Sequence, residues 1–221
     1  MPPPSQRRPE SVAAVCISCH PVGEVPPAKN ERLRYVMDFS AKFETGLPYG
    51  EFLEKYATDD QRQRWDEFHA SISLADDQKT LLQSFVRDMK VLVLAGTWCG
   101  DCVNQCPIFE HFVAGSSRIH VRYFDRDDNP DLAEELQICG GARVPSLLFL
   151  SEDGYVCGRY GDRTVSKYRD MVASLDGAAC PTGIPGNDPL TQQVVQDWLD
   201  EFERIQWMLR TSGRLRKLHG D

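Results

Sequence analysis

The sequence predicts an α/β fold, in which a mixed sheet carries helices on both faces, with a helical extension before it and a further helix after it. Beyond Asp76, segments with helical spacing of apolar residues alternate with short apolar runs, as is typical of a covered sheet. The turn signal Asp153-Gly154 joins two later apolar runs as a hairpin. The chain has 221 residues, of which 41% are hydrophobic, so it can bury one core and still carry sizeable extensions.

We expect four segments along the chain. Residues 1–29 are rich in proline and show no helical or strand period, which predicts an arm without regular structure. Residues 30–75 are expected to form a helical extension, and residues 76–178 the α/β domain. Residues 179–221 then form a Pro/Gly linker and an amphipathic helix.

The spacing of apolar residues predicts each element in turn. The extension contains helices over residues 31–43, 51–57 and 58–72, with Thr58 as the N-cap of the last one. In the α/β domain we expect helix 76–88, strand 90–96, helix 99–114, strand 119–128, helix 129–138, two strands within 144–161 and helix 162–175.

The last helix has a broad apolar stripe. Such a stripe must dock on the domain, because an exposed one would aggregate. Its members are Val195, Trp198, Leu199, Phe202, Ile205 and Leu209.

Charge and hydropathy exclude several classes of partner. With 25 basic and 33 acidic residues the net charge is −8, which argues against a nucleic-acid or anionic-membrane surface. The N-terminal residues lack the apolar stretch of a secretory signal, and no window approaches the roughly 18–20 apolar residues of a membrane span. We therefore expect a soluble, cytoplasmic protein. In that reducing compartment, the eight cysteines are more often catalytic, metal-binding or buried thiols than structural disulfides.

The motif "GTWCGDC", Gly96 to Cys102, follows directly on the apolar run at residues 90–95. Cys99 falls at a helix N-terminus, where unpaired backbone N–H groups and the helix dipole favour a thiolate. Cys102 lies one turn further on the same side, so the two sulfurs can form a disulfide. We expect Cys99 to attack a substrate disulfide and Cys102 to resolve the mixed disulfide that results.

Two further features support redox chemistry over a metal site. Trp98 offers a flat apolar surface beside the thiol. Pro145 begins an apolar strand, where it has no N–H to pair in a sheet interior. A cis Val144-Pro145 bond would turn the strand edge towards the dithiol and let the Val144 backbone pair with an extended substrate.

From about Asp76 to Leu175 the chain resembles the thioredoxin family. The resemblance rests on the strand leading into "WCGDC", on Pro107 eight residues after Cys99, on "DRDDNP", on "VPSLLFLSEDG" and on Gly161. It implies a thiol-disulfide oxidoreductase with Cys99 as nucleophile, Cys102 as resolving thiol and Pro145 as the cis-proline. The remaining substrate-binding residues would be Trp98, Gly100, Asp101 and Val144.

A protein of this kind needs no organic cofactor and no metal. It receives electrons from an upstream dithiol reductase and passes them to disulfide-containing proteins or small molecules.

The chain departs from the family pattern at two places. The family usually carries a buried aspartate six residues before the nucleophile, which is thought to help deprotonate the resolving thiol, and here that residue is Val93. Resolution is then slower, or it uses another base such as Asp101 or water. Asp101 also replaces the usual proline, and its carboxylate opposes a nearby thiolate. We therefore expect Cys99 to be less acidic than in strongly oxidising relatives, and the protein to act as a reductant.

The other cysteines leave alternatives open. Cys106 is either a small buried hydrophobe or a regulatory partner for Cys102. Cys139 precedes the expected cis-proline; it either lies within reach of the dithiol or, as we expect, packs in the core or a loop. Cys157 and Cys180 are taken as structural.

The motif "CISCH", comprising Cys16, Cys19 and His20, has the form of a c-type haem attachment site. It also fits a metal site, a second redox pair or an incidental pair. Two alternatives to disulfide reduction follow from the sequence. One is a docking or redox-sensing module without turnover, and the other is a haem carrier.

Overall fold

The structure is a computed structural model that describes residues 37–174 and 189–221. Four of the expectations above lie outside the described residues. They are the proline-rich arm, the motif from Cys16 to His20, Cys180 and the linker at residues 179–188.

One mixed sheet of four strands forms the centre of the fold, in the order β2-β1-β3-β4. The strands are β1 (Met89–Ala95), β2 (Ile119–Asp125), β3 (Ser146–Ser151) and β4 (Val156–Gly161). β1 pairs in parallel with β2 and antiparallel with β3, and β3 pairs antiparallel with β4. The two central strands, β1 and β3, are buried almost throughout, which explains why both are continuous apolar runs.

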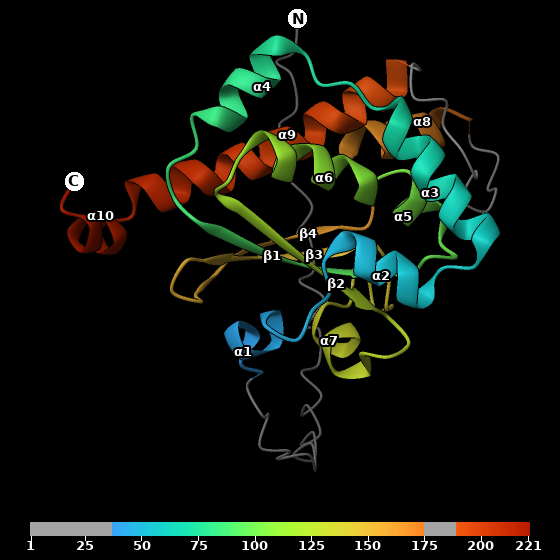
Figure 1. Cartoon of the computed structure of the whole chain (residues 1–221), viewed down its shortest axis with the longest axis horizontal. Coiled ribbons are helices and arrows are strands. Elements are labelled where there is room, and N and C mark those ends of the chain that lie inside the picture. Colours follow the sequence, from blue (N-terminus) through green and yellow to red (C-terminus); the bar gives the residue numbers. More distant parts are fainter. Residues whose placement is uncertain (1–36, 175–188) are drawn as a thin grey trace, which may run out of the picture. The chain divides into compact units, whose positions relative to one another are not determined.

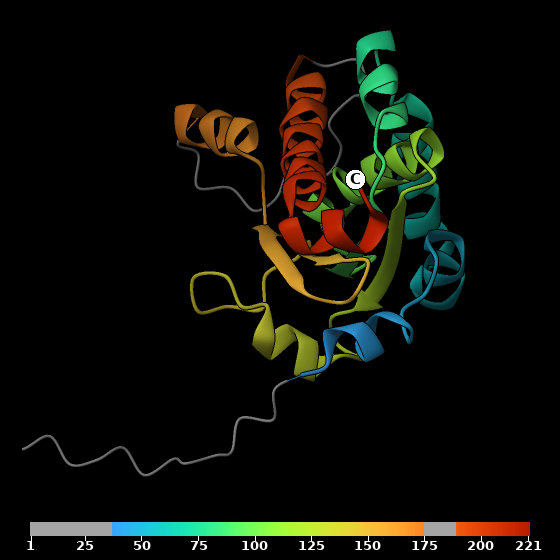
Figure 2. The same ribbon diagram turned by 90° about the vertical axis from the view of Figure 1, so that its left-hand side faces the viewer.

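Helices cover both faces of this sheet, as predicted. Figures 1 and 2 show α6 (Cys106–Gly115) and α9 (Pro189–Thr211) on one face, and α1 (Phe39–Phe43) and α7 (Pro130–Glu135) on the other. The parallel pair β1 and β2 is joined by the crossover that contains α6, as a parallel connection requires. The mixed α/β sheet expected from the sequence is therefore confirmed.

The helical extension is also present, as α2 (Tyr49–Tyr56) and α3 (Asp59–Ser71), and α4 (Asp76–Gln83) then leads to β1. Thr58 caps α3 as expected, and it forms a capping box with Gln61. Of the helix predicted over 31–43, residues 31–36 lie outside the described residues, and the described part is helical only as α1, which begins at Phe39. The Asp38 carboxylate accepts hydrogen bonds from the backbone N–H groups of Ser40 and Ala41, so Asp38 is the N-cap.

The single helix predicted from Cys99 to residue 114 is in fact two. α5 (Gly100–Val103) ends within one turn, and α6 restarts at Cys106 after Gln105, whose backbone angles (φ −132°, ψ −46°) are not helical. Pro107 explains the break, because it has no N–H to donate to the carbonyl of Val103 one turn earlier.

The C-terminal helix α9 docks on the domain as predicted. All six residues of the expected stripe are buried. α8 (Val165–Ser174) precedes it and α10 (Gly213–His219), capped by Ser212, follows it. In the described ranges 37–174 and 189–221, neither α9 nor any other helix has the apolar length needed to span a membrane.

Candidate active site

The two cysteines of the motif lie just beyond the carboxyl end of β1. Cys99 is the N-cap of α5, and its carbonyl accepts the N–H of Val103 at 3.0 Å. Cys102 is in the only turn of that helix. The sequence placed Cys99 correctly at a helix N-terminus, although this helix has only four residues.

Three thiols, rather than two, meet at this point. Cys99 and Cys102 are hydrogen-bonded to each other, and Cys102 is also hydrogen-bonded to Cys106. All three are free thiols, with exposed fractions of 7%, 0% and 0%. The expected pair is thus brought together, and Cys106 joins it through the break between α5 and α6.

The strand edge beside the thiols has the geometry expected for it. The Val144-Pro145 peptide bond is cis, and Cys99 Sγ lies 3.5 Å from the Val144 carbonyl oxygen. A disulfide carried on an extended peptide would meet Cys99 next to this backbone.

The environment raises the pKa of Cys99. Its hydrogen bond to Cys102 contributes most, followed by burial, and the Asp101 carboxylate acts in the same direction. The helix N-terminus acts in the expected direction, because the backbone N–H of Cys102 lowers the pKa of Cys99, but the neighbouring thiol and burial outweigh this effect. The shift agrees with the other expectation, that Cys99 is less acidic than in strongly oxidising relatives.

The raised pKa predicts how Cys99 reactivity depends on pH. Because the thiolate is the reactive form, its alkylation by iodoacetamide should rise about tenfold per pH unit from pH 6 to pH 8.5 without levelling off. Mass spectrometry of the peptide containing Cys99 gives this rate separately from the other cysteines. A plateau already reached below pH 7 would show an acidic thiol and contradict the expectation.

Asp101 is held in an ion pair rather than turned towards a substrate. Its carboxylate lies 2.5 Å from an Nη atom of Arg163, and the residue is only 4% exposed. Arg163 also contacts Asp162 at 3.4 Å, and Arg143 reaches the same carboxylate at 3.2 Å. Gly100 is buried as well. These positions do not favour the expected substrate contacts of Gly100 and Asp101.

The exposed rim of the site carries an aromatic ring and two cations. Trp98 is 44% exposed, and the Arg126 guanidinium lies 4.4 Å from the centre of its ring. Arg143, whose side chain is 43% exposed, precedes Val144. The side chains of Val144 and Pro145 are buried, so a substrate would meet their backbone rather than their side chains.

Gln105 supports the site and was not predicted from the sequence. Its amide nitrogen donates to the carbonyls of Asp101 (3.2 Å) and Asp162 (2.9 Å), and its amide oxygen accepts the indole N–H of Trp198 at 3.0 Å. It therefore connects α5, the end of β4 and α9. Trp198 is 93 residues away in sequence, so no local pattern could identify this link.

Thr97 has a similar role towards the helical extension. Its hydroxyl is 3.1 Å from the Tyr56 carbonyl and 2.9 Å from the Gln61 amide oxygen. Its own carbonyl accepts the indole N–H of Trp65 at 3.0 Å. The helical extension thus contacts the segment just before Cys99 directly, whereas α9 reaches the site through the Gln105 side chain.

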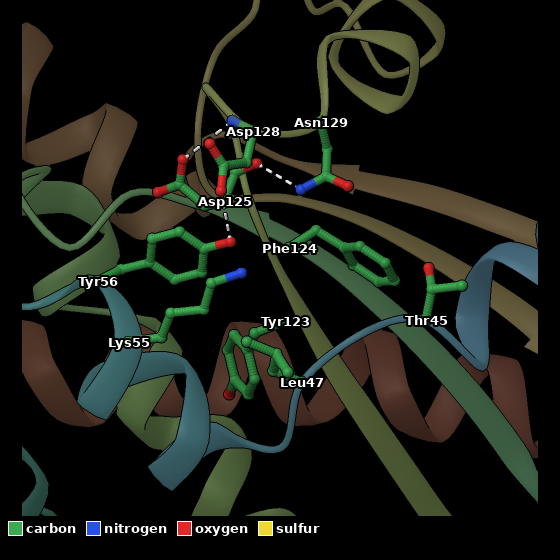
Figure 3. Close-up of a pocket in the computed structure, with 9 residues that line it drawn as sticks. All are labelled: Thr45, Leu47, Lys55, Tyr56, Tyr123, Phe124, Asp125, Asp128 and Asn129. Carbon is green, nitrogen blue, oxygen red and sulfur yellow. Dashed lines mark hydrogen bonds between the residues drawn. The ribbon is translucent and has the colours of Figure 1, made fainter.

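A separate pocket of about 280 Å³ lies where β2 ends. Figure 3 shows Lys55 and Tyr56 of α2 facing Asp125 and Asp128, and the Tyr56 hydroxyl donates to Asp128 at 2.8 Å. Its lining residues are Thr45, Leu47, Lys55, Tyr56, Tyr123, Phe124, Asp125, Asp128 and Asn129. None of the thiols lines it, so it is not where they would meet a substrate.

The described part of the chain holds no group of three or more His, Cys, Asp or Glu side chains placed to bind a metal ion.

Val93 is fully buried in β1, between Tyr123 of β2 and Leu147 of β3. Its position therefore contributes no acid or base.

Comparison with known proteins agrees with this fold. A family model described as thioredoxin matches residues 46–176. A protein of unknown function from Pseudomonas aeruginosa has a TM-score of 0.61 at 15% identity, covering 76% of this chain and 96% of that one. An HIV epitope scaffold gives 0.52 at 18% identity, with coverages of 84% and 99%. Mitochondrial thioredoxin 3 from Saccharomyces cerevisiae gives 0.31 at 19% identity, with coverages of 48% and 98%. No curated protein matches.

Proposed function

Because the chain belongs to the thioredoxin family, we propose that it is a thiol-disulfide oxidoreductase that reduces protein or small-molecule disulfides through Cys99 and Cys102. The observation that supports this best is the contact between the two thiols beside the Val144 carbonyl. A thiol pair in contact can close a disulfide without large backbone movement.

The proposed reaction has two exchange steps. The Cys99 thiolate attacks one sulfur of the substrate disulfide, and the other substrate sulfur leaves as a thiolate. The Cys102 thiolate then attacks Cys99, which breaks the mixed disulfide and releases the second substrate thiol. The protein ends as the Cys99–Cys102 disulfide, and an upstream dithiol reductase returns it to the dithiol.

The raised pKa of Cys99 supports reduction as the direction. A strong oxidant needs a reduced form that is stabilised, usually by an acidic thiolate, and this site gives Cys99 no such advantage. The proposal also places the protein in the cytoplasm, where thiols are kept reduced.

The Cys102→Ser variant tests the order of attack. With the resolving thiol removed, incubation with a disulfide-bonded peptide should trap a mixed disulfide at Cys99, because no neighbouring thiol releases it efficiently. Mass spectrometry identifies the adduct, and Cys99→Ser is the matched control that should form none at this site. An adduct found at Cys139, with Cys99 unmodified, would contradict the assignment of Cys99 as the nucleophile.

A further inference from the structure

The resolving thiol, Cys102, has no direct way to lose its proton. It is completely buried, and burial together with its hydrogen bond to Cys106 raises its pKa well above the usual range. Its sulfur must nevertheless be ionised to attack Cys99, because the thiolate is the nucleophile. The proton therefore has to leave through a neighbouring side chain.

Cys102 is hydrogen-bonded to Cys106, and Glu110 lies on the same helix as Cys106, one turn further along α6. Cys106 is the first residue of α6, and Glu110 lies four residues later, so both are on the same side of the helix. The Tyr123 hydroxyl is 3.2 Å from the Cys106 carbonyl and 3.0 Å from a carboxylate oxygen of Glu110, which holds Glu110 beside this turn. Cys106 is completely buried, whereas Glu110 is half-buried and can exchange a proton with solvent.

The Glu110 carboxylate and the Cys106 thiol also interact electrostatically, since a charge on Glu110 raises the pKa of Cys106. Burial raises the pKa of Glu110 itself, although the hydrogen bond from Tyr123 and the charge of Arg122 oppose the shift. A carboxylate of raised pKa is a better base. Asp101 is less suited, because Arg163 pairs with its carboxylate.

Several titratable or charged side chains interact with Glu110 and are relevant to its pH dependence. The Tyr123 hydroxyl on β2 is hydrogen-bonded to it, and Cys106 on α6, Arg122 on β2 and Tyr49 on α2 interact with it electrostatically. Tyr49 in turn interacts electrostatically with Arg62 and Asp66 of α3. Figure 3 shows Tyr123 at the pocket beside β2, with its hydroxyl pointing away from Lys55 and Asp128.

We propose that Glu110 accepts the proton that Cys102 loses when it resolves the mixed disulfide, with the Cys106 thiol passing the proton between them. This inference rests on the proposed disulfide reduction. The Cys102 proton moves to the Cys106 sulfur, and the Cys106 proton moves to the Glu110 carboxylate. Cys102 then attacks Cys99, the bond between Cys99 and the substrate sulfur breaks, and the electron pair leaves with that substrate sulfur. No further oxidant or reductant takes part.

The reaction with 5,5′-dithiobis(2-nitrobenzoate) separates the two exchange steps. Attack by Cys99 releases a first nitrothiobenzoate anion, and resolution by Cys102 releases the second, so absorbance shows two phases. The background for this test carries serine at Cys16, Cys19, Cys139, Cys157 and Cys180, and its insulin-reducing activity is checked first.

In the Glu110→Gln variant, the first phase should keep its rate and the second should slow about tenfold or more at pH 7, as expected on removing a general base. The second phase of the parent should also fall as the pH drops through the titration of Glu110, and this acidic limb should vanish in Glu110→Gln. Glu134→Gln, on the exposed side of α7, is the matched control. Cys106→Ala should slow the second phase similarly, whereas Cys106→Ser, whose hydroxyl can still pass a proton, should retain most of the rate.

An unchanged second phase in Glu110→Gln, or an equal slowing of both phases, would overturn the role of Glu110. Failure of the proposed function looks different. In that case the parent releases no second anion, or Cys99→Ser reproduces both phases.

Discussion

Replacing Cys99 with serine is expected to reduce insulin reduction by dithiothreitol to the rate of dithiothreitol alone. A serine hydroxyl is not ionised at neutral pH and forms no disulfide, so neither the mixed disulfide nor the Cys99–Cys102 disulfide can arise. Turnover is measured from the precipitation of the released insulin chains. Cys157→Ser, which changes a half-buried thiol on β4, is the matched control and should leave the rate unchanged.

The outcome of this assay also distinguishes a disulfide reductase from a docking or redox-sensing module. Equal rates for the wild type and Cys99→Ser would show that the thiols do not turn over. The chain would then act as a docking or redox-sensing module on a thioredoxin-like framework.

Replacing Trp198 with alanine is expected to cost about 3–5 kcal/mol of unfolding free energy. The indole is fully buried and packs edge-on against Phe109 and Tyr160, whose ring centroids lie 4.8 Å and 4.9 Å from its own. Its removal leaves a large cavity under α9 and also takes the hydrogen-bond donor away from the buried Gln105 oxygen. In urea denaturation the loss appears as a lower midpoint concentration of urea, while the dependence of the unfolding free energy on urea concentration stays similar.

Two variants accompany this measurement. Trp198→Phe keeps most of the packing and should lose less, so it isolates the effect of the hydrogen bond to Gln105. Val172→Ala changes a side chain that is 65% exposed and should stay within about 0.5 kcal/mol of the wild type. A Trp198→Ala protein that lost less than about 1 kcal/mol would mean that α9 is not docked as described.

Much of the fold follows from patterns that are local in sequence. The apolar runs of β1 and β3 are continuous because both strands are central in the sheet. The stripe of α9 repeats at helical spacing because one side of that helix is buried. The "WCGDC" motif and the proline at position 145 were also readable, since spacing and residue type define them.

The rest depends on contacts between distant segments. The apolar spacing from Cys99 to residue 114 suits one continuous helix, and only Pro107 indicates that α5 ends early. The raised pKa of Cys99 arises from burial and from the neighbouring Cys102, which appear only when the fold is complete. The hydrogen bonds of Gln105 to Trp198 and of Thr97 to Trp65 join both extensions to the site, and no local sequence pattern predicts them.

We propose above that Cys99 and Cys102 interconvert between a dithiol and a disulfide. Redox titration in dithiothreitol buffers, followed by alkylation and disulfide mapping, tests it most directly. We expect a two-electron couple, with a slope near 30 mV per tenfold change in the ratio of oxidised to reduced protein. We also expect a Cys99–Cys102 disulfide that is absent from both the Cys99→Ser and the Cys102→Ser variants. A wild-type protein in which these two sulfurs never join, or a couple that persists in Cys99→Ser, would show that Cys99 and Cys102 are not the redox pair.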